Sequence, residues 1–148
     1  MPPPFDRPPL GLDLALTAKA TGRAFDDAME AAGGSRSTWL VLLALKSGRA
    51  ENQRQVADAV GIQGATLTHH LNAMESSGLV TRRRDDANRR VHVVELTDDG
   101  EALFRRLRTA AAAFDKRLRG GLSEADESAF VATLARLREN VADLAGPT

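Results

Sequence analysis

The chain has 148 residues, 43% hydrophobic and 27% charged, which is enough for one globular domain with its own core but too little for two substantial ones. It contains no cysteine, and this excludes disulfides, cysteine-ligated zinc, thiol redox switches and cysteine nucleophiles. The net charge is zero, with 20 basic and 20 acidic residues, which argues against indiscriminate binding to polyanions. No apolar run approaches the roughly 18 residues of a membrane span, and no signal-peptide segment is present. We therefore expect a cytoplasmic protein without a membrane partner.

The first nine residues, "MPPPFDRPP", hold five of the six prolines of the chain. Proline removes backbone donors and keeps the chain extended. We therefore predict a Pro-rich arm over residues 1–9, followed by a single domain over residues 10–148.

Two helices are predicted after the arm. Apolar and small residues recur at helical spacing from Leu10 to Ala32, and a Gly-Gly pair then stops the first helix. Ser35 or Ser37 can cap a second helix, which carries the segment "TWLVLLALKSG". Because this segment is almost entirely apolar, we expect it in the centre of the core.

A pair of short helices around a glycine is the most informative feature. The first is predicted over Gln53–Val60 and stops at Gly61, which can adopt a turn conformation that other residues resist. The second begins at Gly64. Val56 supplies an apolar side, and Ala57 is small enough to permit close approach. This is the pattern of a helix-turn-helix, although alone it is a weak signal.

The second of these helices has two different faces. At about 100° per residue, Leu67, Leu71 and Met74 share an apolar face, and His70 falls near its edge. The opposite face and its flanks carry Ala65, Thr66, Thr68, His69, Asn72 and Ser76. His69 and Asn72 can point at base edges, whereas His70 is expected to pack or hydrogen-bond at the core boundary. The alternative for His69 is ordinary solvated surface.

The adjacent histidines are poorly placed for a metal. Neighbouring side chains on a helix point about 100° apart, whereas zinc pairs on one helix are usually three or four residues apart. The only other histidine, His92, falls on a predicted strand. We predict neither a metal site nor a cofactor.

Two strands, "LVTRRR" and "VHVVEL", follow and are joined by the segment Asp85–Arg90. Five arginines lie at or beside the tip of this hairpin: Arg82, Arg83, Arg84, Arg89 and Arg90. A helix-turn-helix with such a hairpin is a winged helix, whose helix can enter the DNA major groove while the wing reaches phosphates or the minor groove. The alternative is a solvated hairpin partly neutralised by Asp85 and Asp86. No catalytic motif is found, so an enzyme is not predicted.

Two further helices are predicted beyond the hairpin. Thr97 can cap a helix that runs to about Leu118, and the segment Ser123–Asp126 has capping-box spacing for a last helix to about Leu144. In the last helix Phe130, Leu134, Leu137, Val141 and Leu144 are separated by alternating steps of four and three residues. This is a heptad seam rather than the broader stripe of a helix lying on its own core.

Similar apolar steps occur in the other long helices. They comprise Leu14, Ala18, Phe25 and Met29 in the first, and Leu103, Leu107, Ala110 and Phe114 in the fifth. We predict a homodimer that uses residues 10–34 and 98–148 around a DNA-binding lobe at residues 35–97. The dimerisation residues are Leu14, Phe114, Phe130, Leu134, Leu137 and Val141. The alternative is that these helices pack on each other within one chain.

Taken together, these segments resemble the MarR family of bacterial transcription regulators over essentially the whole chain. The resemblance is carried by "RQVADAVGIQGATLTHHLNAMESSGLVTRRRDDANRRVHVVELTDDGEALF", above all by "MESSGLVTR" and "LTDDG". It implies a mainly helical (α+β) homodimer with a winged helix-turn-helix, in which the N- and C-terminal helices build the dimer interface. It also implies binding to a pseudo-palindromic double-stranded DNA operator, repression of a nearby or its own promoter, and release by a small, often aromatic, effector.

The resemblance also carries residue roles. Thr66, Thr68, His69 and Asn72 match positions that read the major groove, and Arg89 and Arg90 match the wing tip. The wing commonly has an Asp where this chain has Asn88, which puts in doubt a salt bridge to Arg90 unless Asp85 or Asp86 replaces it. The ligand cleft would be lined by Arg23, Phe25, Trp39 and Phe104, although a lone Trp on an apolar helix is more often core. The alternative function is a winged-helix protein-interaction module without DNA binding.

Overall fold

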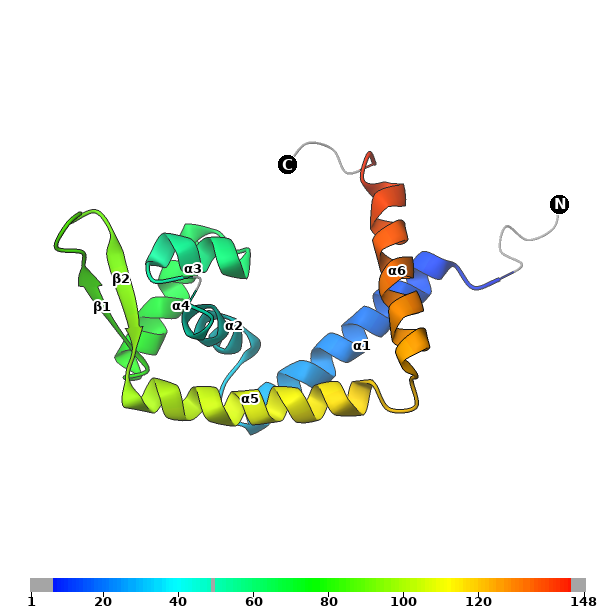
Figure 1. The fold of residues 1–148 in the computed structure, drawn as a ribbon, viewed down its shortest axis with the longest axis horizontal. Helices are drawn as coiled ribbons and strands as arrows, with labels where there is room; N and C mark the ends of the chain where they lie inside the picture. Colours follow the sequence, from blue (N-terminus) through cyan, green and yellow to red (C-terminus); the bar gives the residue numbers. More distant parts are fainter. Residues whose placement is uncertain (1–6, 49, 145–148) are drawn as a thin grey trace. The chain divides into compact units, whose positions relative to one another are not determined.

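The computed structural model describes residues 7–48 and 50–144. Over this range the chain is mainly helical with one two-stranded antiparallel sheet (Figure 1). The elements are α1 (Leu10–Ala31), α2 (Arg36–Lys46), α3 (Gln53–Val60), α4 (Gly64–Ser76), β1 (Val80–Arg84), β2 (His92–Leu96), α5 (Asp98–Leu118) and α6 (Glu124–Val141). No helix in the described part is long and apolar enough to cross a membrane. Residues 1–6 of the predicted arm lie outside the described residues, and α1 begins directly after Pro9.

The chain forms two compact units, residues 1–114 and residues 115–148, and α5 runs from the first into the second. The first unit holds one hydrophobic core, built by the end of α1, one side of α2, the two short helices, the hairpin and the first half of α5. Its largest fully buried side chains are Met29, Val41, Leu42, Val56, Leu67, Leu71, Val80 and Leu107.

One expectation about apolar residues is wrong, and the expectation that α2 lies in the core holds for one side of that helix only. Met29 and Leu107 are fully buried and Leu103 is 3% exposed, so these residues belong to the core of one chain and not to a seam between chains. Steps of three and four residues describe both situations, because each places side chains on one side of a helix. Conversely, α2 is not buried all round, since Leu40 and Leu43 are 36% and 42% exposed on the side away from the core.

The short helices have the predicted boundaries. The Asn52 side chain accepts a hydrogen bond from the backbone N–H of Gln55 at 2.9 Å and caps α3. Gly61 ends α3 with φ +74°, a left-handed conformation that favours glycine. Ala57 is 9% exposed, which agrees with its predicted place where α3 and α4 approach. These residues, all recognisable in the sequence, therefore explain the turn between α3 and α4.

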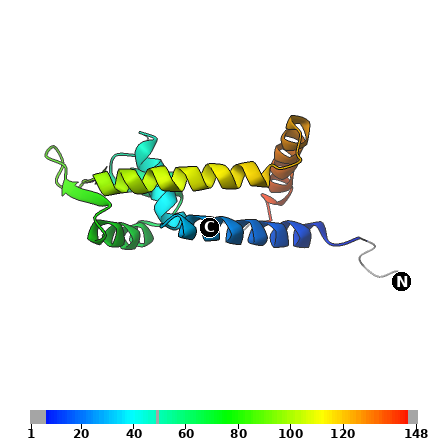
Figure 2. The ribbon, with the colours of Figure 1, turned by 90° about the horizontal axis from the view of Figure 1, so that it is seen from below.

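The hairpin pairs Val80 with Leu96 at its base and Arg84 with His92 near its tip. Val80 and Val94 are 1% and 3% exposed, so one face of the sheet packs on the core. An isolated antiparallel bridge joins Asn52 to Val93 and ties the start of α3 to the second strand. Figures 1 and 2 show the hairpin loop standing clear of α2, α3 and α4.

A compact joint connects the end of α4, the base of the hairpin and the start of α5. The Thr97 hydroxyl donates to the carbonyl oxygen of Gly78 at 2.5 Å and accepts from the backbone N–H of Gly100 at 3.1 Å. The Thr97 backbone N–H also donates to the carbonyl of Leu79 at 3.1 Å. Thr97 thus caps α5 as predicted and also fastens that helix to the chain that leaves α4.

The second unit contains the end of α5 and α6. The predicted capping box is present: Ser123 Oγ accepts from the backbone N–H of Asp126 at 3.1 Å, and the Asp126 carboxylate accepts from the backbone N–H of Ser123 at 2.9 Å. Arg119 pairs with Asp115 at 2.7 Å and also with Glu127, which links the two helices. No residue of α6 is buried, and α6 ends at Val141 rather than near Leu144.

The capping box predicts a pH dependence of the second unit. Hydrogen bonds from Ser123 hold the pKa of the Asp126 carboxyl below its ordinary value. A depressed folded pKa gives stabilisation that is complete above the ordinary value of about 4 and is lost as the pH falls through the lowered one. Asp126→Asn removes the titration but keeps an accepting oxygen. We expect thermal melts followed by circular dichroism to favour the wild type at about pH 6, with the difference shrinking as the pH falls below about 4 and through the lowered pKa. A constant difference across this range would contradict the role of the carboxylate.

Candidate nucleic-acid interface

The outer face of α4 is exposed as predicted. Leu67, Leu71 and Met74 are buried on the inner face, and the outer face presents Ala65, Thr66, His69, Asn72 and Ser76. His70 is half-buried, with its ring centroid 6.1 Å from that of His69. The two adjacent histidines therefore lie in different surroundings, and only His69 stands on the outward face.

The Thr68 hydroxyl is less available for a contact outside the protein than its position beside the outer face of α4 suggests. Its hydroxyl donates to the carbonyl of Gly64 at 2.9 Å and accepts from the Gln53 side-chain amide at 2.6 Å. The side chain is therefore used to join α4 to α3, which fixes the angle between the two short helices.

Arg82 does not lie with the arginines at the hairpin tip. It is in the middle of β1, its side chain is 16% exposed, and it turns back to α4. There its guanidinium donates to the side-chain oxygen of Asn72 and pairs with Glu75 at 3.2 Å. The backbone N–H of Arg82 donates to the same Glu75 carboxylate at 3.1 Å. These hydrogen bonds from Arg82 hold the pKa of Glu75 below its ordinary value.

The tip of the hairpin is held by its own polar side chains. Asp85 accepts from the backbone N–H of Ala87 at 2.9 Å, and Asn88 accepts from that of Arg90 at 3.1 Å. Arg84 donates to the carbonyl of Arg89 at 3.1 Å. Among the described residues the side chains of Arg89 and Arg90 have no ion pair, so neither Asp85 nor Asp86 supplies the salt bridge to Arg90 considered from the sequence.

A groove runs between the two short helices and the hairpin. It is lined on one side by Arg54, Gln63 and Thr68, and on the other by Arg90 and His92. Sequence reasoning missed Arg54, because a single arginine on a short helix has no distinguishing spacing. Its place in this groove depends on the bridge that brings the start of α3 against the second strand. Arg54, Arg90 and His92 thus line a groove that also contains Gly64 and Thr68 at the start of α4, together with one acid, Asp58.

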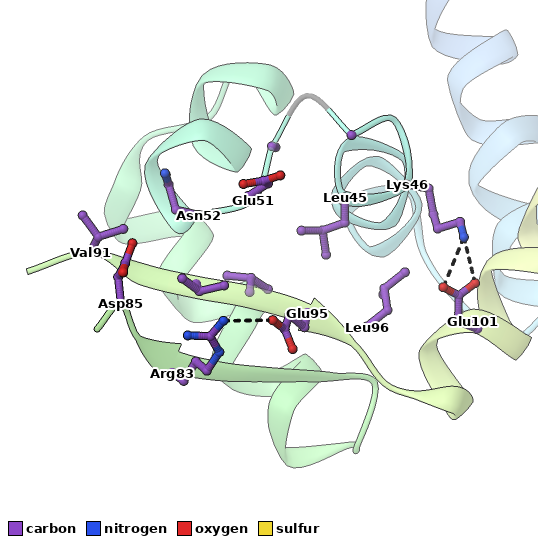
Figure 3. A pocket seen from close by; sticks show the side chains of 14 residues that line it. Leu45, Lys46, Glu51, Asn52, Arg83, Asp85, Val91, Glu95, Leu96 and Glu101 are labelled. Atoms are coloured by element: carbon purple, nitrogen blue, oxygen red, sulfur yellow. Dashed lines mark hydrogen bonds and ion pairs between the residues drawn. The ribbon is translucent and has the colours of Figure 1, made fainter. Parts of the chain in front are cut away.

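The side of the hairpin that faces α2 has a different character. A hollow there is lined by Lys46, Glu51, Arg83, Asp85, Glu95 and Glu101, together with apolar residues (Figure 3). Arg83 pairs with Glu95 at 3.3 Å, and Lys46 pairs with Glu101 at 3.1 Å. Both cations of this hollow therefore have ion-pair partners, whereas the side chains of Arg89 and Arg90 at the tip have none within the part of the chain that the structure describes.

Comparison with known proteins identifies the family. The MarR family profile matches residues 35–92. The uncharacterised helix-turn-helix transcriptional regulator YdgJ of Bacillus subtilis is 32% identical over 113 residues, which cover 76% of this chain and 69% of that protein. The chain belongs to the MarR family. It is a DNA-binding transcriptional regulator of a family that consists of regulators and not of enzymes.

Solved structures of similar proteins confirm the winged-helix fold. The transcriptional repressor CouR, bound to a 23-mer DNA duplex, is 28% identical with a TM-score of 0.77, and the match covers 87% of this chain and 92% of that one. BpsR of Bordetella bronchiseptica, whose DNA binding is regulated by 6-hydroxynicotinic acid, is 26% identical with a TM-score of 0.77, over 93% of this chain and 97% of that one. The predicted family and fold class are therefore confirmed.

The residues predicted to line the ligand cleft of this MarR-family chain do not all lie together in the structure. The rings of Trp39 and Phe104 stack with centroids 5.6 Å apart and 13° between their planes. Phe25 instead meets Phe114 edge to face at 5.3 Å, and Arg23 is exposed on α1. A hollow beside the stacked pair is also lined by Leu43, Lys46 and Arg108. Sequence reasoning missed these two cations because they lie on two helices that meet only in the fold.

Proposed function

We propose that this regulator is a sequence-specific repressor that binds a pseudo-palindromic operator as a homodimer and is released by a small aromatic molecule. The observation that carries the DNA-binding mode is the exposed outer face of α4 beside a hairpin whose tip arginines have no ion pair among the described residues. Such a face fits the major groove, where neutral side chains read base edges, while guanidinium groups fit the phosphates or the narrow minor groove. The DNA-bound structure of CouR supports this assignment.

In this proposal Thr66, His69 and Asn72 read base edges, and Arg84, Arg89 and Arg90 contact the DNA backbone. Thr68 and Arg82 act within the protein, because their polar groups already have partners. The DNA-binding lobe at residues 35–97 is completed by buried side chains from both flanking regions, residues 10–34 and 98–148.

DNA binding is tested with the duplex that lies upstream of the gene, using fluorescence anisotropy at several salt concentrations. We expect submicromolar binding at low salt that an excess of unlabelled random duplex does not displace. This binding should weaken steeply as the salt concentration rises. Failure to bind any duplex at low salt would support the alternative of a winged helix that binds only proteins. Transcription from that promoter in the presence and absence of the protein then tests repression.

The homodimer is proposed from apolar side chains that the single chain leaves uncovered. Leu10, Leu12, Leu14 and Leu16 are 39% to 65% exposed within the first two turns of α1. On α6, Phe130 and Val141 are 58% and 53% exposed, and Leu134 and Leu137 are half-buried. Phe114 is half-buried against Phe25. Apolar surface of this kind is typical of an interface between chains.

Light scattering on the intact chain and on a chain ended after Gly121 tests this interface. The shortened chain retains the complete core of the first unit, because α6 contributes no buried residue. We expect a dimer for the intact chain and a monomer, or a dimer at least tenfold weaker, for the shortened one. A monomeric intact protein would contradict both the seam and the two-fold operator.

The effector site is proposed beside Trp39 and Phe104, where Arg108 offers a cation to an aromatic carboxylate, while Lys46 at the same hollow is already paired with Glu101. Regulation of BpsR by 6-hydroxynicotinic acid supports this chemistry. Titration with hydroxybenzoate should change the fluorescence of Trp39, the only tryptophan, and at ten times Kd raise the free energy of unfolding by about 1.4 kcal/mol.

Arg108→Met should weaken this response, whereas Arg105→Met, on the same helix but outside the hollow, should leave it unchanged. If hydroxybenzoate and 6-hydroxynicotinate change neither fluorescence nor melting, this site has no support.

A further inference from the structure

We propose that Arg82 is a positioning residue that fixes the orientation of the Asn72 side-chain amide and so determines which base Asn72 can recognise. The clamp formed by Asn72, Glu75 and Arg82 then makes α4 select a guanine. This inference rests on the proposed DNA-binding mode and specifies its base preference. Its basis is the contact between the middle of β1 and the outer face of α4, ten residues apart in sequence.

The first step concerns the orientation of the Asn72 amide. A guanidinium group has only donors, so the amide atom that faces Arg82 must be the oxygen. The amide is planar, and its NH₂ group therefore points away from the clamp. No other hydrogen bond to the Asn72 side chain occurs among the described residues, and Asn72 is exposed. Asn72 therefore presents two N–H donors outward while its acceptor is engaged.

The second step concerns the bases that match this orientation. In the major groove guanine offers two acceptors, N7 and O6, whereas adenine offers one acceptor and one donor. An asparagine that binds adenine in a bidentate manner must use its oxygen and its nitrogen together. The oxygen of the clamped Asn72 is turned toward Arg82 and cannot face adenine together with the nitrogen, so its outward donors fit guanine. An unclamped asparagine would be able to rotate and to accept from adenine.

The third step concerns charge. Glu75 is the only ionisable acid of α4, and that helix carries no Lys or Arg. Two side-chain contacts and one backbone contact from Arg82 satisfy the Glu75 carboxylate. Without Arg82 this carboxylate would meet the DNA with its charge uncompensated. Arg82 therefore has two separable effects, one on overall affinity and one on base preference.

The experiment selects binding sites for full-length proteins from a pool of randomised duplexes and measures affinities for the enriched sequences by anisotropy. The position that Asn72 reads is identified as the one where Asn72→Ala relaxes the base preference. The wild type should enrich a half-site with guanine at that position. Arg82→Met should lower affinity for every sequence, and the double variant Arg82→Met, Glu75→Gln should regain affinity by removing the unpaired carboxylate. The double variant should nevertheless lose the guanine preference at that position, roughly five- to a hundredfold, or exchange it for adenine.

A matched control is available one residue along the same strand. Arg83 and Glu95 also form an ion pair, both side chains are 57% exposed, and both line the hollow on the other side of the hairpin, whose lining does not include Asn72. The double variant Arg83→Met, Glu95→Gln should leave the preference at that position unchanged. If Arg82→Met, Glu75→Gln does not fold, Arg82→Lys replaces it, because an ammonium group keeps the charge without the planar fork and should weaken the same preference.

Three outcomes would overturn the proposal. The first is that the wild type prefers adenine at the position where Asn72→Ala relaxes the base preference. The second is that Asn72→Ala relaxes the preference at no position. The third is that the folded variant without the Arg82 clamp still prefers guanine there. Failure of the proposed function has a different signature, because the wild type would then enrich no sequence at all.

Discussion

Replacement of Gly100 by alanine is expected to lower the free energy of unfolding by about 3 kcal/mol or more. Gly100 is buried in the first turn of α5. A Cβ added there would lie 2.1 Å from the carbonyl oxygen of Leu79 and 3.1 Å from its carbonyl carbon. The obstacle is backbone that also accepts the hydrogen bond from Thr97, so it cannot move without breaking the joint between α4 and α5. Urea unfolding followed by circular dichroism measures the change.

Gly11→Ala is the matched control. Gly11 also lies in the first turn of a helix, but nothing lies within 4 Å of its added Cβ. Alanine should be neutral there or stabilise by up to about 1 kcal/mol, because it restricts the unfolded chain and favours the helix. Equal stability of Gly100→Ala and the wild type would mean that α5 can shift away from Leu79, contrary to the close packing described for the joint.

The double variant Arg89→Ala, Arg90→Ala should weaken DNA binding by on the order of ten- to a hundredfold at low salt. Each guanidinium that contacts a phosphate releases counterions, so the slope of log affinity against log salt should fall by about 2 for each wing that contacts DNA. The effect should be similar for all sequences, because backbone contacts carry no base information. Anisotropy titrations at four or more salt concentrations measure both quantities.

The double variant Arg105→Ala, Arg106→Ala makes the same change in net charge on exposed positions of α5. It should leave the salt slope nearly unchanged. If the two double variants behave alike, the effect belongs to the total charge of the protein and the wing has no special role. Unchanged binding by the wing variant would contradict the proposed contact directly.

Local signals in the sequence were sufficient for most boundaries of the elements, although α6 ends at Val141 and not near Leu144. Gly61, the caps at Ser35 and Thr97 and the capping box at Ser123 each act within four residues, and the structure contains all of them. The two faces of α4 were also predictable, because a helix alone fixes which side chains share a side. The outward His69 and the half-buried His70 follow from the same periodicity.

Contacts between distant segments were not predictable in this way. Arg82 was grouped with the tip arginines because it is near them in sequence, but the strand directs it back to α4 after the turn at Gly78, where φ is +76°. Trp39 and Phe104, both predicted to line a ligand cleft, stack across two helices, while Phe25 packs against Phe114 instead. Periodicity assigns a side chain to one face of a helix without specifying which neighbour covers that face.

The hydrogen bonds of Thr97 have a mechanical consequence for α4. One hydroxyl bonds both to the carbonyl that follows α4 and to the first turn of α5. The end of α4 and the start of α5 therefore rotate together unless these short hydrogen bonds break. A small change in the tilt of α5 would therefore change the orientation of α4, the helix proposed to enter the major groove. In the proposed dimer, the spacing between two half-sites on DNA would therefore depend on the direction of α5.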